Sequence, residues 1–234
     1  MPAGCGNGAG TLPGSPESLP YALVPAAPTA VYYGSFVAVD LDNDGIEEEI
    51  KYDEGIGGAS FLSVSRIRDN QFYNLHTKHL MSGGGVCGLT DITGDGTPEL
   101  IWWWLNTPER ALVFATEVEA DDVSASLSTL HSIEFNTEED QLPNGDWGAS
   151  VAMRGAFDLN GDGVTDALAL IANAGITLRP RDILLWDLAT DSVKWRLPTG
   201  ATPTGGAEVV DVTGNGTQDL VIGLEAPGNG AAAG

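Results

Sequence analysis

Four stretches of the sequence place oxygen-bearing side chains at the same short spacing. They read DLDNDGIEE at 40–48, DITGDGTPE at 91–99, DLNGDGVTD at 158–166 and DVTGNGTQD at 211–219. Position 1 is always aspartate, position 6 is always glycine and position 9 is always acidic. The side chains at positions 1, 3, 5 and 9 are those of Asp40, Asp42, Asp44 and Glu48; Asp91, Thr93, Asp95 and Glu99; Asp158, Asn160, Asp162 and Asp166; and Asp211, Thr213, Asn215 and Asp219. Carboxylates spaced this closely repel one another unless a cation lies between them.

The chemistry that suits this pattern is calcium binding. Ca²⁺ takes six to eight oxygen ligands at about 2.3–2.6 Å, and glycine at position 6 permits the sharp turn that brings side chains 1, 3 and 5 together. The backbone carbonyl at position 7 supplies a further oxygen, from Ile46, Thr97, Val164 and Thr217. A single stretch is equally consistent with a solvated acidic turn, but four copies favour a metal site. The sequence therefore predicts up to four Ca²⁺ ions.

Charge sets the expected order of affinity among the four stretches. At positions 1, 3, 5 and 9 they contain four, three, three and two carboxylates in chain order, which together are twelve of the 33 acidic residues. Because affinity follows ligand charge, we expect the Asp40 stretch to bind most tightly and the Asp211 stretch most weakly. The whole chain has a formal net charge of −23, which argues against nucleic acid and anionic membranes as partners.

The residues around each stretch indicate strands. β-prone segments such as SFVAVD and GAEVVD precede the stretches, and apolar runs such as ELIWWWL and DLVIGL follow them. An EF-hand would need flanking helices and a glutamate at position 12, where this chain has Lys51, Trp102, Ala169 and Ile222. Each ion is therefore expected in a turn between two strands.

The stretches recur at intervals of 51, 67 and 53 residues, which suits one four-stranded propeller blade per interval. Each complete interval offers four strand candidates joined by Gly-, Pro- or Asp-rich turns. We expect an all-β fold, a β-propeller of three complete blades and a partial fourth. The repeats span 21–228, with blades at about 30–80, 81–133, 148–199 and 205–228. Residues 1–20 are expected to form a flexible Gly/Pro-rich tether, and residues 229–234 a flexible tail.

The D-x-[DNT]-x-[DN]-G-x-x-[DE] loop, repeated at blade spacing, resembles the FG-GAP/VCBS repeats of integrin-α-like β-propellers over about residues 30–224. The resemblance implies calcium loops between the first and second strands of each blade, where the ion is structural. It also implies an extracellular or cell-surface module that binds a protein or carbohydrate, for example in adhesion. The long acidic connection at 134–148, which contains Trp147, would lie on the opposite, recognition face. A disordered acidic insertion is the alternative interpretation of that connection.

The partial fourth blade leaves strand edges open. The array is expected to be either an imperfect four-bladed ring or part of a larger propeller with further blades elsewhere. Open strand edges would also favour self-association. No apolar run approaches the roughly 18 residues that cross a bilayer, and the N-terminal segment lacks the apolar core of a secretory signal. The PAGC segment is similar to the mature end of a bacterial lipoprotein, in which Cys5 would carry lipid.

Other reactive residue types have simpler explanations. His76 and His79 lie three apart in an expected strand, so their side chains should point to opposite faces and not form a metal pair. The tryptophans at 102–104 are expected to pack between blades, with sugar stacking as the alternative. Cys87 is expected to be packed and unreactive, and His131 to be structural.

No nucleophile elbow, phosphate loop or cysteine–histidine spacing is visible in the sequence, so we do not expect an enzyme. Glycoside hydrolysis needs a pair of acidic residues, and the chain has so many acids that no one pair can be assigned to this role. Two alternatives to a binding module therefore stay open. One is an accessory or catalytic propeller of a polysaccharide-degrading enzyme, and the other is a purely structural spacer.

Overall fold

The computed structural model describes residues 30–31, 36–41, 44–54, 60–68, 71–80, 84–107, 110–121, 123–136, 151–172, 181–199 and 207–223. All regular structure in these ranges is β-strand, so the expected all-β class is confirmed. The strands are β1 (Ala30–Val31), β2 (Phe36–Val39), β3 (Glu48–Glu54), β4 (Ser60–Arg68), β5 (Gln71–Leu80), β6 (Gly84–Thr90), β7 (Glu99–Thr107), β8 (Arg110–Ala120), β9 (Ala125–Asn136), β10 (Val151–Phe157), β11 (Ala167–Ala172), β12 (Arg181–Asp187), β13 (Ser192–Thr199), β14 (Ala207–Val210) and β15 (Asp219–Ile222). Within the same ranges, no helix has the length and apolar character needed to cross a membrane.

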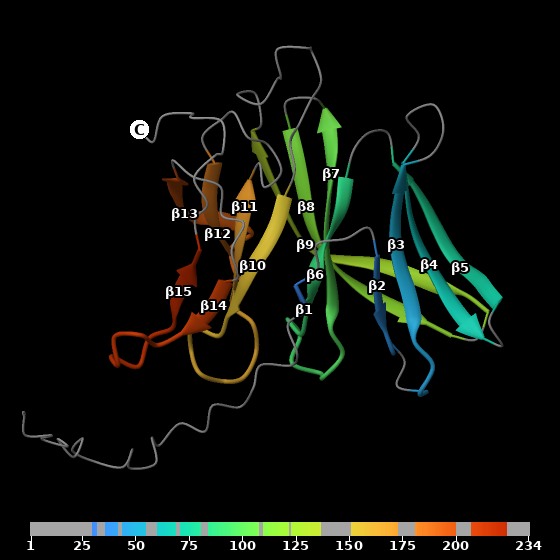
Figure 1. Cartoon of the computed structure of the whole chain (residues 1–234), viewed down its shortest axis with the longest axis horizontal. Helices are drawn as coiled ribbons and strands as arrows, with labels where there is room; N and C mark the ends of the chain where they lie inside the picture. The colour runs from blue at the N-terminus through green and yellow to red at the C-terminus, as the bar shows by residue number, and fades with distance from the viewer. Residues whose placement is uncertain are drawn as a thin grey trace, which may run out of the picture.

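The strands form four antiparallel sheets that follow one another along the chain (Figure 1). The first sheet has the order β2-β3-β4-β5, the second β1-β6-β7-β8-β9, the third β10-β11-β12-β13 and the fourth β14-β15. Apart from β1, each strand pairs with its neighbour in sequence, so every sheet is an up-and-down meander. β1 joins the second sheet, because Ala30 and Val31 pair with Leu89 and Gly88.

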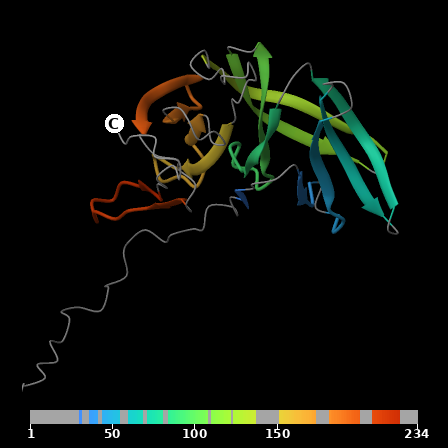
Figure 2. The same cartoon turned by 45° about the horizontal axis from the view of Figure 1, so that its top comes forward.

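The first strands of the sheets lie together. β2 contacts β6, β6 contacts β10, and β10 contacts β14, so these strands form a row through the molecule. The sheets follow in chain order from one end of this row to the other (Figures 1 and 2). No strand of the fourth sheet pairs with a strand of the first sheet in the described part of the chain.

Apolar side chains fill the spaces between consecutive sheets. Alternate side chains of β7 point to opposite faces of the second sheet. On one face, Leu100 and Trp102 belong to the cluster shared with the first sheet. Ile101 and Trp103 belong to the cluster shared with the third sheet. A smaller cluster joins the third sheet to the fourth and includes Phe157, Ala169, Leu185, Val209 and Leu220. Apolar side chains thus occupy the space between each pair of consecutive sheets.

Trp102 has the most elaborate surroundings of the three consecutive tryptophans. It is 1% exposed, stacks on Phe114 with ring centroids 4.6 Å apart, and donates its indole N–H to Thr116 Oγ1 at 2.9 Å. Lys78 of the first sheet places its ammonium 4.9 Å from the Trp102 ring centroid. Trp103 is also buried, and Trp104 is partly buried. The expectation that these rings pack between sheets is confirmed.

β6 and β10 each contain a bulge at the same distance before the loop that follows. Register shifts at Val86/Gly88 and at Met153/Gly155 make Cys87 and Arg154 the extra residues. Cys87 is 1% exposed and its thiol donates to the Val151 carbonyl at 3.6 Å. Burial raises the pKa of this thiol to about 12. The expected packing of Cys87 is therefore confirmed.

The fourth sheet ends the array with exposed apolar side chains. Val210 of β14 and Val221 of β15 are 43% and 46% exposed. The last strand of the third sheet also exposes apolar side chains, those of Val193, Trp195 and Leu197. This end of the array is the least covered part of the described core.

Candidate metal centre

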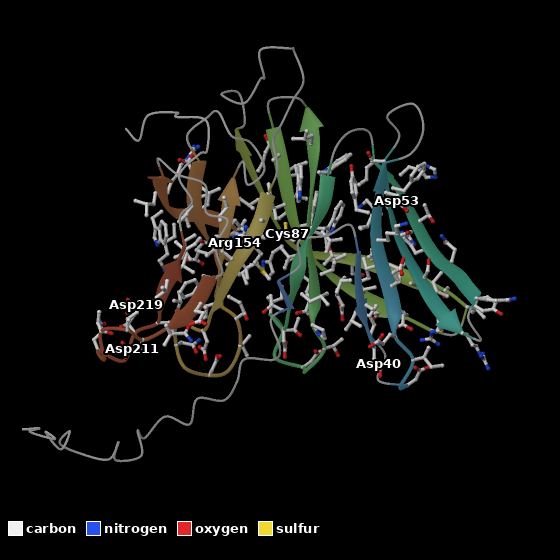
Figure 3. All side chains as sticks on the ribbon, viewed as in Figure 1. Asp40, Asp53, Cys87, Arg154, Asp211 and Asp219 are labelled. Carbon is white, nitrogen blue, oxygen red and sulfur yellow. The ribbon has the colours of Figure 1, made fainter. Side chains whose placement is uncertain are left out.

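Each repeated stretch forms the turn between the first and second strands of its sheet. Loop 1 (40–48) joins β2 to β3, loop 2 (91–99) joins β6 to β7, loop 3 (158–166) joins β10 to β11, and loop 4 (211–219) joins β14 to β15. All four lie along one edge of the molecule, the lower edge in Figure 1, with Asp40 and Asp211 toward its two ends in Figure 3. The expected position of the loops between strands is confirmed.

The first aspartate of each loop shapes the turn. Its Oδ2 accepts a hydrogen bond from the N–H of the glycine at position 6, at 2.7–2.9 Å in all four loops. These glycines have a positive φ, which strains any residue with a side chain: Gly45 at 88°, Gly96 at 90°, Gly163 at 92° and Gly216 at 84°. The sharp turn expected at position 6 is therefore present in every loop.

Positions 5 and 9 also hold the turn in the same way in every loop. Position 5 accepts from the N–H of position 7, and Asn215 does so as well as the aspartates. One oxygen of the acid at position 9 accepts from the N–H of position 2. Its other oxygen has a different partner in different loops: Thr93 at 3.2 Å from Glu99, Asn160 at 3.4 Å from Asp166, and Arg66 at 2.7 Å from Glu48.

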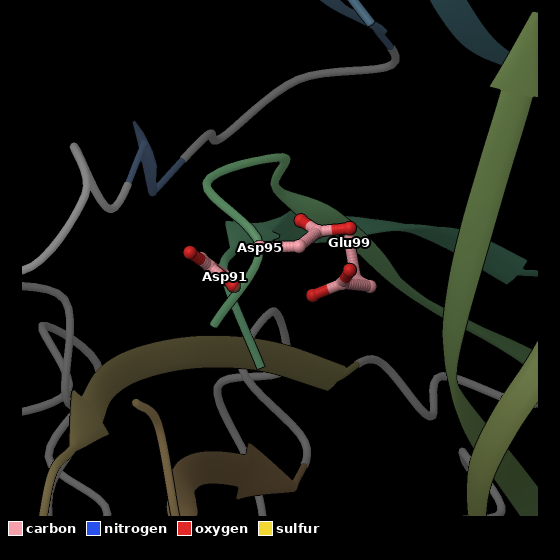
Figure 4. A group of neighbouring side chains, drawn as sticks. All are labelled: Asp91, Asp95 and Glu99. Carbon is pink, nitrogen blue, oxygen red and sulfur yellow. The ribbon is translucent and has the colours of Figure 1, made fainter. Parts of the chain in front are cut away.

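Loop 2 brings three acids together. One carboxylate oxygen each from Asp91, Asp95 and Glu99 lies within 4.8 Å of the other two (Figure 4). The hydroxyl of Thr93 donates to Glu99 at the same place. Carboxylate and hydroxyl oxygens in this arrangement are ligands for a hard divalent cation such as Ca²⁺. Among the described residues, this is the one group of three potential metal ligands that meet so closely.

Glu99 occupies a position that disfavours an isolated carboxylate. It is 1% exposed, and burial raises its pKa above the ordinary value. Hydrogen bonds from the Ile92 N–H and the Thr93 hydroxyl lower this pKa, while the charges of Asp91 and Asp95 raise it. The net shift is upward, so ionised Glu99 is poorly compensated by the protein alone. A divalent cation between the three carboxylates would favour the ionised form, and the residues present therefore fit calcium.

The remaining loops share the frame of loop 2 but differ in their side chains. Loop 4 has two carboxylates, and Thr213 Oγ1 lies 3.4 Å from one oxygen of each, Asp211 and Asp219. Hydrogen bonds, the first from the Gly216 N–H, lower the pKa of Asp211. In loop 1, Asp42 lies outside the described residues. Among the described residues, no triad of acids in loops 1, 3 or 4 matches that of loop 2. Ligation by the position 7 carbonyls stays a prediction.

Sequence reasoning missed three residues at these loops. Thr165, at position 8 of loop 3, places its Oγ1 3.1 Å from Thr90 Oγ1, beside loop 2. Gln218, at position 8 of loop 4, accepts a hydrogen bond from the Asp158 N–H at 3.0 Å. Both residues are at position 8 when the four stretches are aligned, and this shared position could have indicated a common role in contacts between loops. Arg66 lies across from Glu48 on β4, and strand register alone brings it there.

The histidines singled out in the sequence lie in strands, away from the four loops. His76 and His79 lie in a regular part of β5, opposite Val64 and Phe61, which places their side chains on opposite faces as expected. His131 Nδ1 is 3.0 Å from Asp191 Oδ1, a contact between the second and third sheets. Cys5 and residues 137–150, which include Trp147 and most of the acidic connection, lie outside the described residues.

No protein-family model matches the chain, and neither the curated proteins nor the solved structures searched gave a match. The resemblance to FG-GAP/VCBS repeats therefore rests on the loop motif and its spacing.

Proposed function

We propose that this chain is a calcium-stabilised binding module in which Ca²⁺ ions, up to four, hold the turns along one edge of a propeller-like array. The observation that carries the proposal is the meeting of the Asp91, Asp95 and Glu99 carboxylates in loop 2. Support also comes from the common hydrogen-bond frame of all four loops, which keeps positions 1, 5 and 9 in equivalent places. The role of the ion is structural, because the loops connect the strands that pack at the centre.

The propeller arrangement is supported by three features. The first and third sheets are four-stranded meanders, and the second is a meander that β1 extends. The first strands of successive sheets are in contact, and apolar clusters fill the spaces between sheets. A blade in a propeller has this connectivity and this contact pattern. The exposed apolar ends of the third and fourth sheets are where a further blade would pack.

Charge makes bound calcium an effective stabiliser. The formal net charge is −23, and each ion would offset two negative charges. With calcium at about 1 mM and a dissociation constant near 0.1 mM, each occupied loop would add about 1.4 kcal/mol. Several such loops matter against a total stability of about 5–15 kcal/mol.

Sites of this affinity suit an extracellular or cell-surface location. Extracellular calcium modules bind with dissociation constants of about 0.1–1 mM, a range in which they are filled outside the cell. A rigid array that carries connections of variable length is a common scaffold for recognition, and we propose a protein or carbohydrate ligand. A glycan array probed with the calcium-loaded chain, with and without chelator, tests the carbohydrate alternative.

The metal proposal is tested by thermal unfolding with calcium and after chelation. We expect chelation to lower the melting temperature by about 10 °C, as the loss of roughly 3–4 kcal/mol would in a chain of this size. Asp91→Asn should reduce this calcium-dependent shift. The matched control is Asp53→Asn, an exposed aspartate on β3 that pairs with Lys51 away from the loops. A melting curve that does not respond to chelation contradicts the proposal.

A further inference from the structure

Arg66 inserts a positive charge into loop 1. Its Nε and one terminal nitrogen both contact Glu48 Oε1 at 2.7 Å, and its other terminal nitrogen is 3.2 Å from Asp44 Oδ2. Asp44 and Glu48 are positions 5 and 9 of the loop. The guanidinium thus bridges two of the side chains that the sequence pattern assigns to the metal.

This ion pair is buried. The side chain of Arg66 is 2% exposed and that of Glu48 is 0% exposed. The second oxygen of Glu48 accepts from the Leu41 N–H at 2.9 Å, as its counterparts do in the other loops. Both oxygens of this carboxylate therefore have close partners. A guanidinium held by two carboxylates satisfies the charge and the hydrogen bonds that a buried acid requires.

The equivalent positions in the second and third sheets carry no such cation. In the second sheet, Leu100 pairs with Thr116, so the register continues to Glu117 across from Glu99. In the third sheet, the Leu188 N–H donates to the Asp166 carbonyl at this place. Among the first three sheets, where a third strand is described, the arginine is therefore particular to loop 1, the loop with the most carboxylates.

We infer that Arg66 is the internal counter-charge of loop 1, which makes this loop independent of calcium and leaves metal binding to the other loops. The inference rests on the proposed function of those loops. It removes loop 1 from the top of the order of affinity expected from carboxylate number, because that count omits the guanidinium. A Ca²⁺ ion in loop 1 would have to displace Arg66 from Glu48 or lie beside a like charge, and either change lowers affinity.

Calcium stoichiometry, measured by equilibrium dialysis of the full chain, tests the inference. We expect Asp40→Asn, which alters position 1 of loop 1, to leave the number of bound ions unchanged. The matched variant Asp91→Asn, at position 1 of loop 2, should lower that number by one. Arg66→Gln should raise it by one, because Asp44 and Glu48 are then without their cation.

Two results overturn the inference: loss of one ion in Asp40→Asn, or no additional ion in folded Arg66→Gln. Loss of one ion in Asp40→Asn would assign Arg66 to positioning Glu48 for a metal instead. If Arg66→Gln does not fold, the comparison of Asp40→Asn with Asp91→Asn decides alone. Failure of the proposed function is a separate outcome, in which the unmodified chain binds no calcium. A gain of one ion by Arg66→Gln in that case still supports the inference, and no gain refutes both.

Discussion

Thr165 Oγ1 lies 3.1 Å from Thr90 Oγ1, and this buried contact joins loop 3 to the residue just before loop 2. Beside it, the Thr165 N–H donates to the Asp91 carbonyl at 3.4 Å. The backbone of Asp91, position 1 of loop 2, is therefore held in part by the neighbouring sheet. Gln218 makes a similar connection from loop 4 to Asp158 of loop 3. The conformation of each of these loops therefore depends in part on contacts with the next sheet.

Thr165→Val should lower the free energy of unfolding by about 1–3 kcal/mol, because the Thr90 hydroxyl is left buried without this partner. Denaturant unfolding measures the change. Thr129→Val, at an exposed site on β9, is the control and should stay within about 0.5 kcal/mol of the unmodified chain. Equal effects of the two substitutions would show that the hydroxyl contact contributes nothing.

Glu99→Gln should stabilise the chain in metal-free buffer at neutral pH and remove most of the calcium response of loop 2. The folded-state pKa of Glu99 is raised, chiefly by burial, so its ionised form is disfavoured relative to the unfolded chain. Stability should therefore fall as pH rises from the ordinary glutamate pKa through the folded value, and the penalty should be complete above it. Glutamine avoids this penalty. Urea unfolding of both chains across this pH range, without metal, measures the difference. A lower stability of Glu99→Gln at pH 7 contradicts the expectation.

Trp102→Ala should destabilise the chain by about 3–5 kcal/mol, since it empties a buried volume between two sheets and leaves Thr116 without its donor. The control is Trp195→Ala on β13, where the ring is 40% exposed. We expect that change to cost less than about 1 kcal/mol. Chemical denaturation followed by circular dichroism compares the two. Similar costs would mean that the outer edge of the third sheet is covered in solution.

Cys87 should be inert in the folded chain. A thiol with a pKa of about 12 is almost entirely protonated at pH 8, and only the thiolate reacts with alkylating reagents. In a Cys5→Ser background, iodoacetamide should modify Cys87 at least about a thousandfold more slowly than free cysteine. The same chain in urea should react at the rate of free cysteine. A native rate within tenfold of that rate would contradict the buried setting of the thiol.

Much of the fold could be predicted because the loop motif marks the same place in every sheet. Each glycine at position 6 implies a sharp turn, and the apolar runs around it imply two strands, which is what the structure has. Strand alternation also accounts for the tryptophan run, in which Trp102 and Trp104 share one apolar cluster and Trp103 belongs to another. These are local signals, set by the period of a strand and the conformation of a turn.

Contacts between distant segments could not be predicted in the same way. Arg66 reaches loop 1 only because β3 and β4 pair in the register that sets Glu48 opposite it. β1 joins the second sheet through a pairing about 60 residues away in sequence, which no local pattern signals. The count of carboxylates in loop 1 therefore omitted Arg66, whose positive charge lowers the expected affinity of this loop for calcium.

Anomalous X-ray scattering from crystals of the full chain grown with calcium is the most direct measurement of the metal proposal. We predict a peak at loop 2, with oxygens of Asp91, Asp95 and Glu99 at about 2.3–2.6 Å from the ion. Loop 1 should show Arg66 in place of such a peak. The absence of a peak between the three carboxylates of loop 2 at millimolar calcium would contradict the account.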